Sequence, residues 1–509
     1  MVKNFAGGKA KPYLLSLISG VLLVLAFPPF GWHPLAWMAL APLLLAIEPG
    51  KPATAIKCGF LAGAVFFGGA LPWIYNALHV FGHISPPVSV FLLILLILYL
   101  ALYFALFAWG MARLGGGPTT VLLAPALFVS LEYLRGIFLT GFPWALLAHT
   151  QYTLPPVIQI ASITGAPGVA FLIVLVNASL AHFIRSRRKG KPAYAAPAIA
   201  LALAAANVAW GYWHIAAVQK AGGDAFTAAL VQGNIEQEQK WDPQFRDQTA
   251  QKYFALTREA AKEKPSLVVW PEAAAPFYYG VDPDYTVQTR QTVAADGVPL
   301  LFGAIGAERG AEGRIRYSNR AWLVTPSGEE RKYDKIHLVP FGEYIPFRSL
   351  LSFAKKLTQA VEGDIAAGTS TEPVKINGLT VGVQICYEII FPDGSRAFAA
   401  NGARVIVNIT NDAWYGDSAA SAQHMMSIPF RAVENRVPVL RAANTGISCF
   451  ITAAGEIRKP TALFETTVIT DTLTVPPHTR TFYNRFGDLF AWLCVAGVGA
   501  VAARRWRKQ

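Results

Sequence analysis

Charged residues are scarce in this chain of 509 residues. Asp, Glu, Lys and Arg make up 15% of it, whereas a soluble domain carries about 25%. The scarcity is concentrated in residues 12–215, and residues 216–485 have the charge content of an ordinary soluble protein. With 53% hydrophobic residues, this distribution excludes a wholly soluble chain. We expect a membrane domain over residues 1–215, a water-soluble domain over 216–485, and a last apolar segment with a basic tail over 486–509.

Cysteine is also rare, which excludes a fold held together by a disulfide framework. Of the four cysteines, Cys58 and Cys494 lie in apolar stretches and are expected to pack there as small hydrophobic residues. The nine histidines show no spacing typical of metal ligands. We therefore predict neither a metal site nor another cofactor.

Acidic residues are outnumbered by basic ones, and the formal net charge is +13. The basic residues gather beside apolar segments, which argues against a nucleic-acid partner. Loops rich in Lys and Arg remain in the cytoplasm. The clusters are Lys3, Lys9 and Lys11; Arg185, Arg187, Arg188, Lys189 and Lys191; and Arg504, Arg505, Arg507 and Lys508. They predict a multi-pass membrane protein with both termini in the cytoplasm and the soluble domain outside it. In a Gram-negative bacterium, such a protein would lie in the inner membrane with its soluble domain in the periplasm.

Eight apolar segments approach the length of a membrane-spanning helix, which needs about 20 residues. Seven precede the soluble domain and one follows it. The segments are residues 12–29, 34–48, 56–78, 88–114, 119–139, 157–184, 193–214 and 486–503. Residues 140–156 are apolar too, but Gly and Pro interrupt them, so a re-entrant or interfacial segment is expected there.

The soluble domain alternates short β-rich runs with helical stretches. Residues 381–386 and 405–409, for example, have the composition of buried strands, and residues 244–263 and 421–435 that of helices. Strands that alternate with helices predict a layered α/β fold.

Three short segments of this domain each place a reactive residue at or just after the end of an expected strand, or in a loop. In α/β folds, strand ends carry the chemistry. The three residues are Glu272, Lys335 and Cys386. A nucleophilic cysteine needs a base and a cationic or N–H environment for the oxyanion, which Glu272 and Lys335 can supply. Lys335 would also lower the thiol pKa. Taken singly, each residue has a structural alternative: a core cysteine, a loop or helix-capping acid, and a surface lysine.

Together these segments resemble the Glu-Lys-Cys triad of the nitrilase superfamily. The likeness is carried by Trp-Pro-Glu at 270–272, Asp-Lys-Ile-His-Leu at 334–338 and Ile-Cys-Tyr-Glu at 385–388. Residues 335–346 and 408–416, joined to several spans, are similar to the apolipoprotein N-acyltransferases, the membrane-embedded branch of that superfamily. The resemblance covers nearly the whole chain. It implies an α/β nitrilase-like domain, an αββα sandwich, beside a polytopic α-helical membrane domain.

The resemblance implies an acyltransferase mechanism. Glu272 would act as general base, Lys335 would stabilise the tetrahedral intermediate, and Cys386 would be acylated by a phospholipid, usually phosphatidylethanolamine. The thioester would then be attacked by the N-terminal amine of a diacylglyceryl-modified lipoprotein, in the last step of lipoprotein maturation. Such a two-step transfer is expected to show ping-pong kinetics. Membrane lipids and the lipoprotein are the expected partners, and nothing in the sequence indicates more than a monomer.

Five further residues stand out through the same resemblance. Glu343 would orient Lys335 or the incoming amine, or else form a loop ion pair. Glu388 would contribute to the site or hold Cys386 in place, and Tyr387 would shape the pocket or pack in the core. Trp241 and Trp414 look like loop tryptophans that face the membrane, since an indole ring suits that interface. Ordinary packing is the alternative for both.

Other polar residues have weaker assignments. Glu132 and Arg135, spaced i, i+3 in the fifth expected span, would pair with each other, or Arg135 would contact a lipid phosphate. His337 and His424 are expected to be structural. Two other functions remain open: a membrane-anchored nitrilase-like amidase, with water as the acceptor, and a non-catalytic lipid-binding protein.

Overall fold

The computed structural model describes residues 10–240, 242–309, 315–344 and 365–507. The chain divides into two compact units. The first comprises Met1–Tyr75, Pro86–Ile215 and Phe486–Gln509. The second comprises Asn76–Ser85 and Ala216–Arg485. The short segment 76–85 therefore packs with the second unit, although it lies in sequence between helices of the first.

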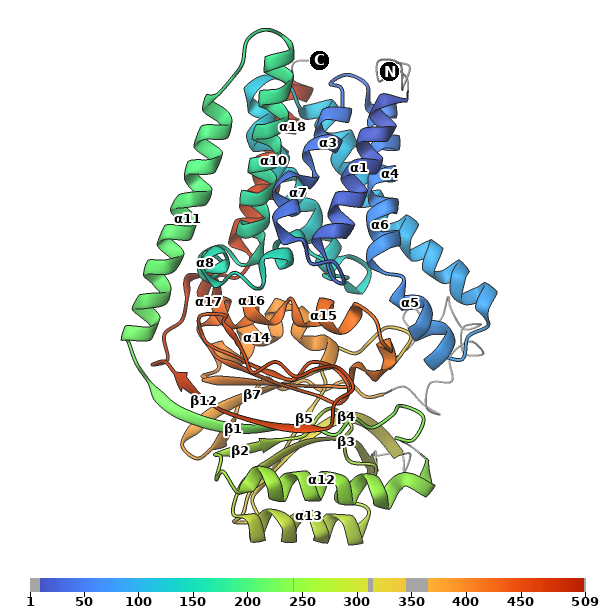
Figure 1. Cartoon of the computed structure of the whole chain (residues 1–509), viewed down its shortest axis with the longest axis vertical. Coiled ribbons are helices and arrows are strands. Elements are labelled where there is room, and N and C mark those ends of the chain that lie inside the picture. The colour runs from blue at the N-terminus through green and yellow to red at the C-terminus, as the bar shows by residue number, and fades with distance from the viewer. Residues whose placement is uncertain (1–9, 241, 310–314, 345–364, 508–509) are drawn as a thin grey trace. The chain divides into compact units, whose positions relative to one another are not determined.

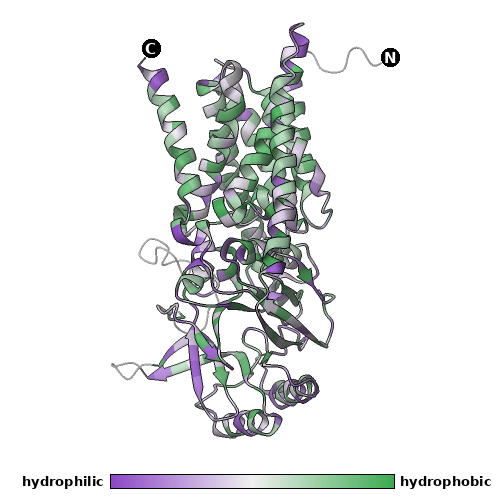
Figure 2. Ribbon diagram, turned by 90° about the vertical axis from the view of Figure 1, so that its left-hand side faces the viewer, coloured by the Kyte–Doolittle hydropathy of each residue, from purple (hydrophilic) through white to green (hydrophobic). Residues whose placement is uncertain are grey.

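Long apolar helices make up most of the first unit (Figures 1 and 2). Within the described residues, six helical segments are long and apolar enough to cross a membrane. They are Pro52–Ala70, Pro86–Leu114, Thr120–Thr140, Ala166–Arg188, Ala195–Lys220 and Leu489–Trp506. The helices concerned are α4 (Pro52–Ala70), α6 (Pro86–Leu114), α7 (Thr120–Ile137), α10 (Ala166–Arg188), α11 (Ala195–Lys220) and α18 (Leu489–Trp506). The predicted polytopic helical domain is thus confirmed.

Two of the eight expected spans are shorter than predicted. Helix α1 (Lys11–Ala26) has 16 residues. The expected span 34–48 is divided into η1 (His33–Leu35), α2 (Ala36–Ala39) and α3 (Ala41–Ala46). Pro42 lies in the first turn of α3 and lacks the backbone N–H that would continue α2, which explains the interruption. The crossing of the membrane by these two segments stays a prediction.

Short helical pieces complete this unit, and Gly or Pro residues separate many of them. The expected span 157–184 is divided among α8, α9 and α10. Gly165, with a φ of 66°, separates α9 from α10. The pieces of the first unit are η3 (Gly117–Thr119), η4 (Phe138–Thr140), η5 (Leu147–Gln151), α8 (Pro155–Ile158) and α9 (Ala161–Thr164). Helix α5 (Trp73–Asn76) begins in the first unit and ends in the second, and η2 (Ala77–Phe81) belongs to the second.

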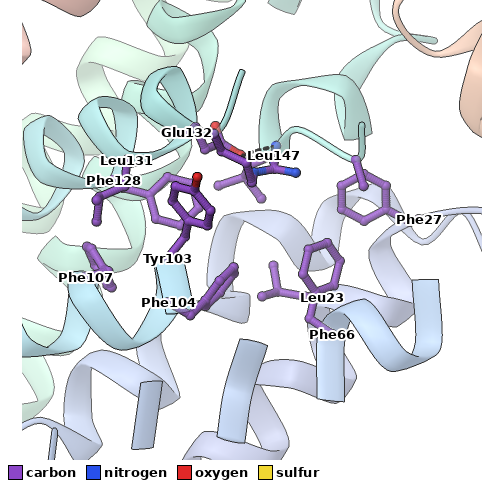
Figure 3. Close-up of a pocket in the computed structure, with 12 residues that line it drawn as sticks. Leu23, Phe27, Phe66, Tyr103, Phe104, Phe107, Phe128, Leu131, Glu132 and Leu147 are labelled. Carbon is purple, nitrogen blue, oxygen red and sulfur yellow. Dashed lines mark hydrogen bonds and ion pairs between the residues drawn. The ribbon is translucent and has the colours of Figure 1, made fainter. Parts of the chain in front are cut away.

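The pair Glu132 and Arg135 in α7 holds the irregular segment that follows it. Arg135 Nη1 donates to the carbonyl of Trp144 over 2.7 Å, and Glu132 Oε1 accepts from the backbone N–H of Leu147 over 2.9 Å. The two side chains lie 3.7 Å apart at the edge of a pocket lined largely by aromatic residues (Figure 3). Its free volume of about 20 Å³ is roughly that of one water molecule. These contacts support the structural alternative for the pair.

The second unit contains two six-stranded sheets. The first has the order β12-β1-β2-β3-β4-β5, and the second β11-β10-β9-β8-β7-β6. Three neighbouring strands run parallel in each sheet, β1-β2-β3 and β7-β8-β9, and the remaining pairs are antiparallel. The first sheet consists of β1 (Asp224–Gln232), β2 (Leu267–Val269), β3 (Leu300–Arg309), β4 (Ile315–Val324), β5 (Glu330–Asp334) and β12 (Thr467–Val475). The second consists of β6 (Val374–Ile376), β7 (Leu379–Ile385), β8 (Val405–Thr410), β9 (Val439–Ala443), β10 (Cys449–Ile451) and β11 (Ile457–Arg458).

Helices cover the outer face of each sheet, so that the unit has four layers (Figure 1). Helices α12 (Arg246–Ala261) and α13 (Pro283–Asp296) lie outside the first sheet, and α14 (Pro392–Ala400) and α16 (Ile428–Asn435) outside the second. The central strands are buried on both faces, and every residue of β8 is buried. This confirms the expected αββα arrangement. The shorter elements are η6 (Pro243–Phe245), η8 (Cys386–Ile390), η9 (Asp412–Tyr415), α15 (Ala420–Met425) and α17 (Phe482–Phe486).

The order of strands determines which residues meet. Strand β2 ends shortly before Glu272, β5 ends directly before Lys335, and β7 ends directly before Cys386. Strand β8, parallel to β7, ends just before Asn411. The two sheets face each other through β4 and β7, among other strands. The ends of strands from both sheets therefore supply the residues of the candidate site.

Candidate active site

Cys386 follows β7 as the first residue of η8 and has a φ of 53°. A left-handed backbone is uncommon for a residue other than glycine and persists where the surroundings impose it. Here the carbonyl of Cys386 accepts hydrogen bonds from Asn408 Nδ2 at 3.4 Å and from His424 Nε2 at 3.2 Å. These contacts fix the sharp turn between strand and helix on which the thiol is carried.

Lys335 is buried between two carboxylates. Its Nζ lies 3.4 Å from Glu272 Oε1 and 3.0 Å from Glu343 Oε1, and its side chain is 1% exposed. Burial lowers the pKa of this ammonium, but the charges of Glu343 and Glu272 outweigh burial and raise the pKa above its usual value. Lys335 is therefore a permanent cation in the site at neutral pH.

Glu272 accepts hydrogen bonds at both oxygens. Asn319 Nδ2 donates to Oε1 over 2.7 Å, and the backbone N–H of Asn411 donates to Oε2 over 2.8 Å. Burial raises the pKa of this carboxyl, but the charge of Lys335 and the donated hydrogen bonds outweigh it and hold the pKa below its usual value. Glu272 is consequently ionised at neutral pH and able to accept a proton.

The thiol of Cys386 is protonated in the resting site. Burial raises its pKa well above the usual value, the negative charge of Glu272 raises it further, and Lys335 opposes both without reversing the shift. The sequence led us to expect that Lys335 would lower the thiol pKa, and its influence has that sign. The expectation fails for the net shift because burial, which the sequence does not reveal, is the larger effect.

Glu343 and Glu388 have different surroundings. Glu343 contacts Lys335, and its Oε1 accepts from Asn319 Nδ2 over 2.8 Å, so one amide nitrogen connects both carboxylates that flank the lysine. Glu388 instead accepts from the backbone N–H of Ile336 and of Ile385, each over 2.6 Å. It thereby ties the strand end that carries Lys335 to the one that carries Cys386. These contacts support the structural alternative for Glu388.

Comparison with known proteins identifies the family of this chain. The model of the apolipoprotein N-acyltransferase N-terminal domain matches residues 19–179, and that of the carbon–nitrogen hydrolases matches residues 227–477. The apolipoprotein N-acyltransferase of Geobacter metallireducens is 43% identical over 506 residues, which are 98% of this chain and 96% of that protein. The chain belongs to the apolipoprotein N-acyltransferase family. The resemblance predicted from the sequence is thus confirmed.

A second relative, the apolipoprotein N-acyltransferase of Methylococcus capsulatus, is 35% identical over 98% of this chain and 97% of its own length. Among solved structures, an amidase from Nesterenkonia sp. is 20% identical, with a TM-score of 0.38, and covers 50% of this chain and 91% of the amidase.

The three aromatic residues expected from the family resemblance are Tyr387, Trp414 and Trp241, and they differ in how far they are buried or described. Tyr387 is buried, and its ring centroid lies 5.1 Å from that of Phe391. Trp414 is 43% exposed, and its ring lies 6.1 Å from that of Phe81, in η2 of the segment that packs with this unit. Trp241 lies outside the described residues. Tyr387 thus packs in the interior of this unit, whereas the ring of Trp414 is partly exposed to solvent.

Beneath Cys386 lies a buried polar network that sequence analysis missed. Arg441 donates to Asp412 Oδ2 over 2.8 Å and to Asn408 Oδ1 over 2.6 Å. Asp412 Oδ1 lies 3.1 Å from His424 Nδ1. The charge of Arg441 contributes to lowering the pKa of Asp412 to about 2, although burial acts in the opposite direction. The signal for this network was Arg441 itself, a single charge in an otherwise apolar strand.

The two histidines are structural, in keeping with expectation from the sequence. Burial lowers the pKa of His424, so its ring is neutral at pH 7 and donates from Nε2 to the carbonyl of Cys386. His337 stacks on Phe391 with ring centroids 3.6 Å apart. Across the described ranges, no group of three or more His, Cys, Asp or Glu side chains is arranged to hold a metal ion.

Lys240 is a second buried lysine near the family's expected catalytic residues. Its Nζ donates to the backbone carbonyl of Glu272 over 3.0 Å, and the residue is 3% exposed. Burial lowers the pKa of Lys240 to about 8, while the charge of Glu272 acts to raise it. The surrounding sequence is polar and irregular, so no periodicity indicated that this lysine would be buried.

Proposed function

We propose that this protein transfers a fatty acyl chain from a phospholipid to the N-terminal amine of diacylglyceryl-cysteine lipoproteins, through a thioester on Cys386. The observation that carries the proposal is the cluster in which Lys335 contacts both Glu272 and Glu343 and, with Glu272, acts electrostatically on the Cys386 thiol. It occurs in a chain whose relatives along its whole length are named apolipoprotein N-acyltransferase.

In the first half-reaction, the ionised Glu272 takes the thiol proton while the sulfur attacks the ester carbonyl of the phospholipid. The negative charge that develops on the carbonyl oxygen is stabilised by Lys335, with the backbone N–H of Tyr387 as a second donor. Glu272 then returns the proton to the glycerol oxygen, which leaves as lysophospholipid. Because the thiol is protonated at rest, this base is required for attack.

In the second half-reaction, the lipoprotein amine attacks the thioester. Glu272 accepts a proton from the attacking amine, the C–S bond breaks, and Glu272 passes this proton to the departing sulfur, which restores both the thiol and the carboxylate. Lys335 stabilises the second tetrahedral intermediate as it did the first. Glu343, in contact with Lys335, holds the ammonium in position and balances its charge. The sequence of acylation and deacylation gives the ping-pong kinetics expected of a covalent intermediate.

The placement in the cell follows from the basic clusters. We assign residues 1–215 to a membrane domain, 216–485 to a catalytic domain in the periplasm, and 486–509 to a last span with a cytoplasmic tail, in the inner membrane and as a monomer. Lys and Arg beside the apolar segments support this orientation.

One experiment separates this function from the two alternatives. Purified protein is incubated with a phospholipid carrying a labelled acyl chain, and Cys386 is examined by mass spectrometry. An acyl-enzyme that persists until a diacylated lipopeptide is added supports transfer. Rapid loss of the acyl group to water identifies an amidase-like hydrolase, and absence of acylation in folded protein identifies a binding protein. The variants C386A and C386S must lose acylation if the thioester is real.

A further inference from the structure

A pocket separate from the triad residues opens beside Glu272. It encloses about 230 Å³, far more than the roughly 10–15 Å³ that one water needs. Its lining is rich in charged and aromatic side chains: Lys240, Asp242, Arg246, Pro276, Phe277 and Tyr278. The pocket therefore has room for a polar group larger than a water molecule, together with two cations that could bind it.

Lys240 connects this pocket to the catalytic cluster. Its ammonium donates one hydrogen bond, to the carbonyl of Glu272 at 3.0 Å, and makes no other among the described residues. The charge of Glu272 acts on it. A buried ammonium has three N–H donors, and burying them without partners is costly. Lys240 thus has N–H donors available for a ligand that lies close to the reacting atoms.

Arg246 is the second cation. It is half-buried, lines the same pocket, and forms neither an ion pair nor a hydrogen bond within the part of the chain that the structure describes. It is the first residue of α12, whose N-cap residue Phe245 provides no side-chain cap. An unpaired guanidinium at such a position favours an anionic ligand.

The acid in the pocket limits how much negative charge a ligand can carry. Asp242, whose Oδ1 accepts the backbone N–H of Gln244 over 2.9 Å, is the one acidic residue of the lining among the described residues. Two cations against one carboxylate leave a net charge of about one positive unit, which matches a singly charged anion better than a doubly charged one.

We propose that this pocket binds the phosphodiester of the phospholipid acyl donor, with Lys240 and Arg246 donating hydrogen bonds to its two unesterified oxygens. The inference rests on the proposed function and adds to it a binding site for the head group. A phosphodiester carries one negative charge, and planar guanidinium and ammonium donors bind phosphate oxygens strongly. In a glycerophospholipid only the glycerol backbone separates the phosphorus from the reactive ester, so a ligand held by Lys240 has that ester beside Glu272 and Cys386.

The test compares two acyl donors on the full-length protein in detergent. One is a diacyl phospholipid and the other a 4-nitrophenyl ester of the same fatty acid, which lacks phosphate. The specificity ratio is kcat/KM for Cys386 acylation by the phospholipid divided by that for the ester. In R246Q we expect this ratio to fall about tenfold or more, through a higher KM for the phospholipid, since a charge-assisted hydrogen bond is lost. R258Q, an exposed arginine of the same helix, is the matched control.

The outcomes are distinct. An unchanged ratio in R246Q, or an equal fall in R258Q, overturns the proposal. Inorganic phosphate that competes with the phospholipid in the wild type but no longer in R246Q supports it. Competition by phosphate together with an unchanged ratio shows that the pocket holds free phosphate only, and also overturns it. If the wild type is acylated by neither donor, the proposed function itself fails, whatever the pocket binds.

Discussion

The side-chain amide of Asn319 donates a hydrogen bond to Glu272 over 2.7 Å, and the same nitrogen donates to Glu343 over 2.8 Å. Two carboxylates around one lysine repel each other, and a shared N–H donor reduces that repulsion. The bond to Asn319 is also one of the interactions that lower the pKa of Glu272. The position and ionisation of the proposed base thus depend on a residue that need not react.

The first prediction concerns this amide. In N319A, both carboxylates lose a donor, and we expect the initial rate of Cys386 acylation to fall roughly 10- to 100-fold, the cost of a hydrogen bond to a charged group. The rate is measured by mass spectrometry of the acyl-enzyme. N401A, which alters an exposed asparagine, serves as control. Acylation of N319A at the wild-type rate would contradict the assigned role.

The second prediction concerns the pH profile. The pKa of Glu272 is lowered, mainly by Lys335 against the effect of burial, so the base stays ionised below pH ~4.3, the value of an ordinary Glu. The acid limb of kcat/KM for acylation should therefore have its midpoint below about 4.3. Because N319A removes one of the lowering interactions, its midpoint should move to higher pH. An acid limb at pH 5 or above in the wild type would exclude Glu272 as the base.

The third prediction concerns Glu388, which connects the ends of β5 and β7. In E388Q, one carboxylate oxygen becomes an NH₂ group that faces backbone donors, such as those of Ile336 and Ile385. We expect a loss of about 1–3 kcal/mol of stability and a lower acylation rate, because a buried donor is left unsatisfied. Thermal unfolding in detergent measures the first effect. E263Q, at an exposed position, is the control. Equal melting temperatures for both variants would contradict the role of Glu388 in holding the two strand ends together.

The fourth prediction concerns stability in acid. The pKa of Asp412 is lowered to about 2, so its ion pair with Arg441 stabilises the fold above the unfolded pKa of ~3.9 and is lost as the pH falls through about 2. D412N should melt at a lower temperature than the wild type at pH 5 to 7, and the difference should shrink between about pH 4 and 2. A difference that is constant or grows over this range would contradict the assignment.

Glu272 and Cys386 could be predicted as candidate residues because each follows an apolar run, and α/β folds gather strand ends. Lys335 follows the polar residues Glu-Arg-Lys-Tyr-Asp, so the family resemblance was needed to single it out. The sequence could not reveal Asn319, since an amide in the antiparallel strand β4 has no distinguishing pattern. Nor could it give the net pKa shift of the Cys386 thiol. Burial and the charge of Glu272 raise this pKa, the charge of Lys335 lowers it, and only the folded structure shows that the raising effects are larger.

Hydropathy located the apolar segments of the membrane domain but not their interruptions. Pro42 and Gly165 divide segments that composition alone predicts to be continuous. Composition was also misleading for the segment 76–85. Its first residues were assigned to the expected span 56–78, whereas the folded segment packs with the second unit, where Phe81 contacts the ring of Trp414. Such assignments depend on tertiary packing and require the folded chain.

The protonated, buried thiol of Cys386 is protected from oxidation. Oxidants and disulfide-forming catalysts react with thiolates and with accessible sulfur, and a buried thiol of raised pKa offers neither. In the periplasmic location that we propose, this thiol would thus stay reduced without a reductant to repair it. In the proposed mechanism, the thiolate forms only when Glu272 takes the thiol proton as the sulfur attacks the lipid ester.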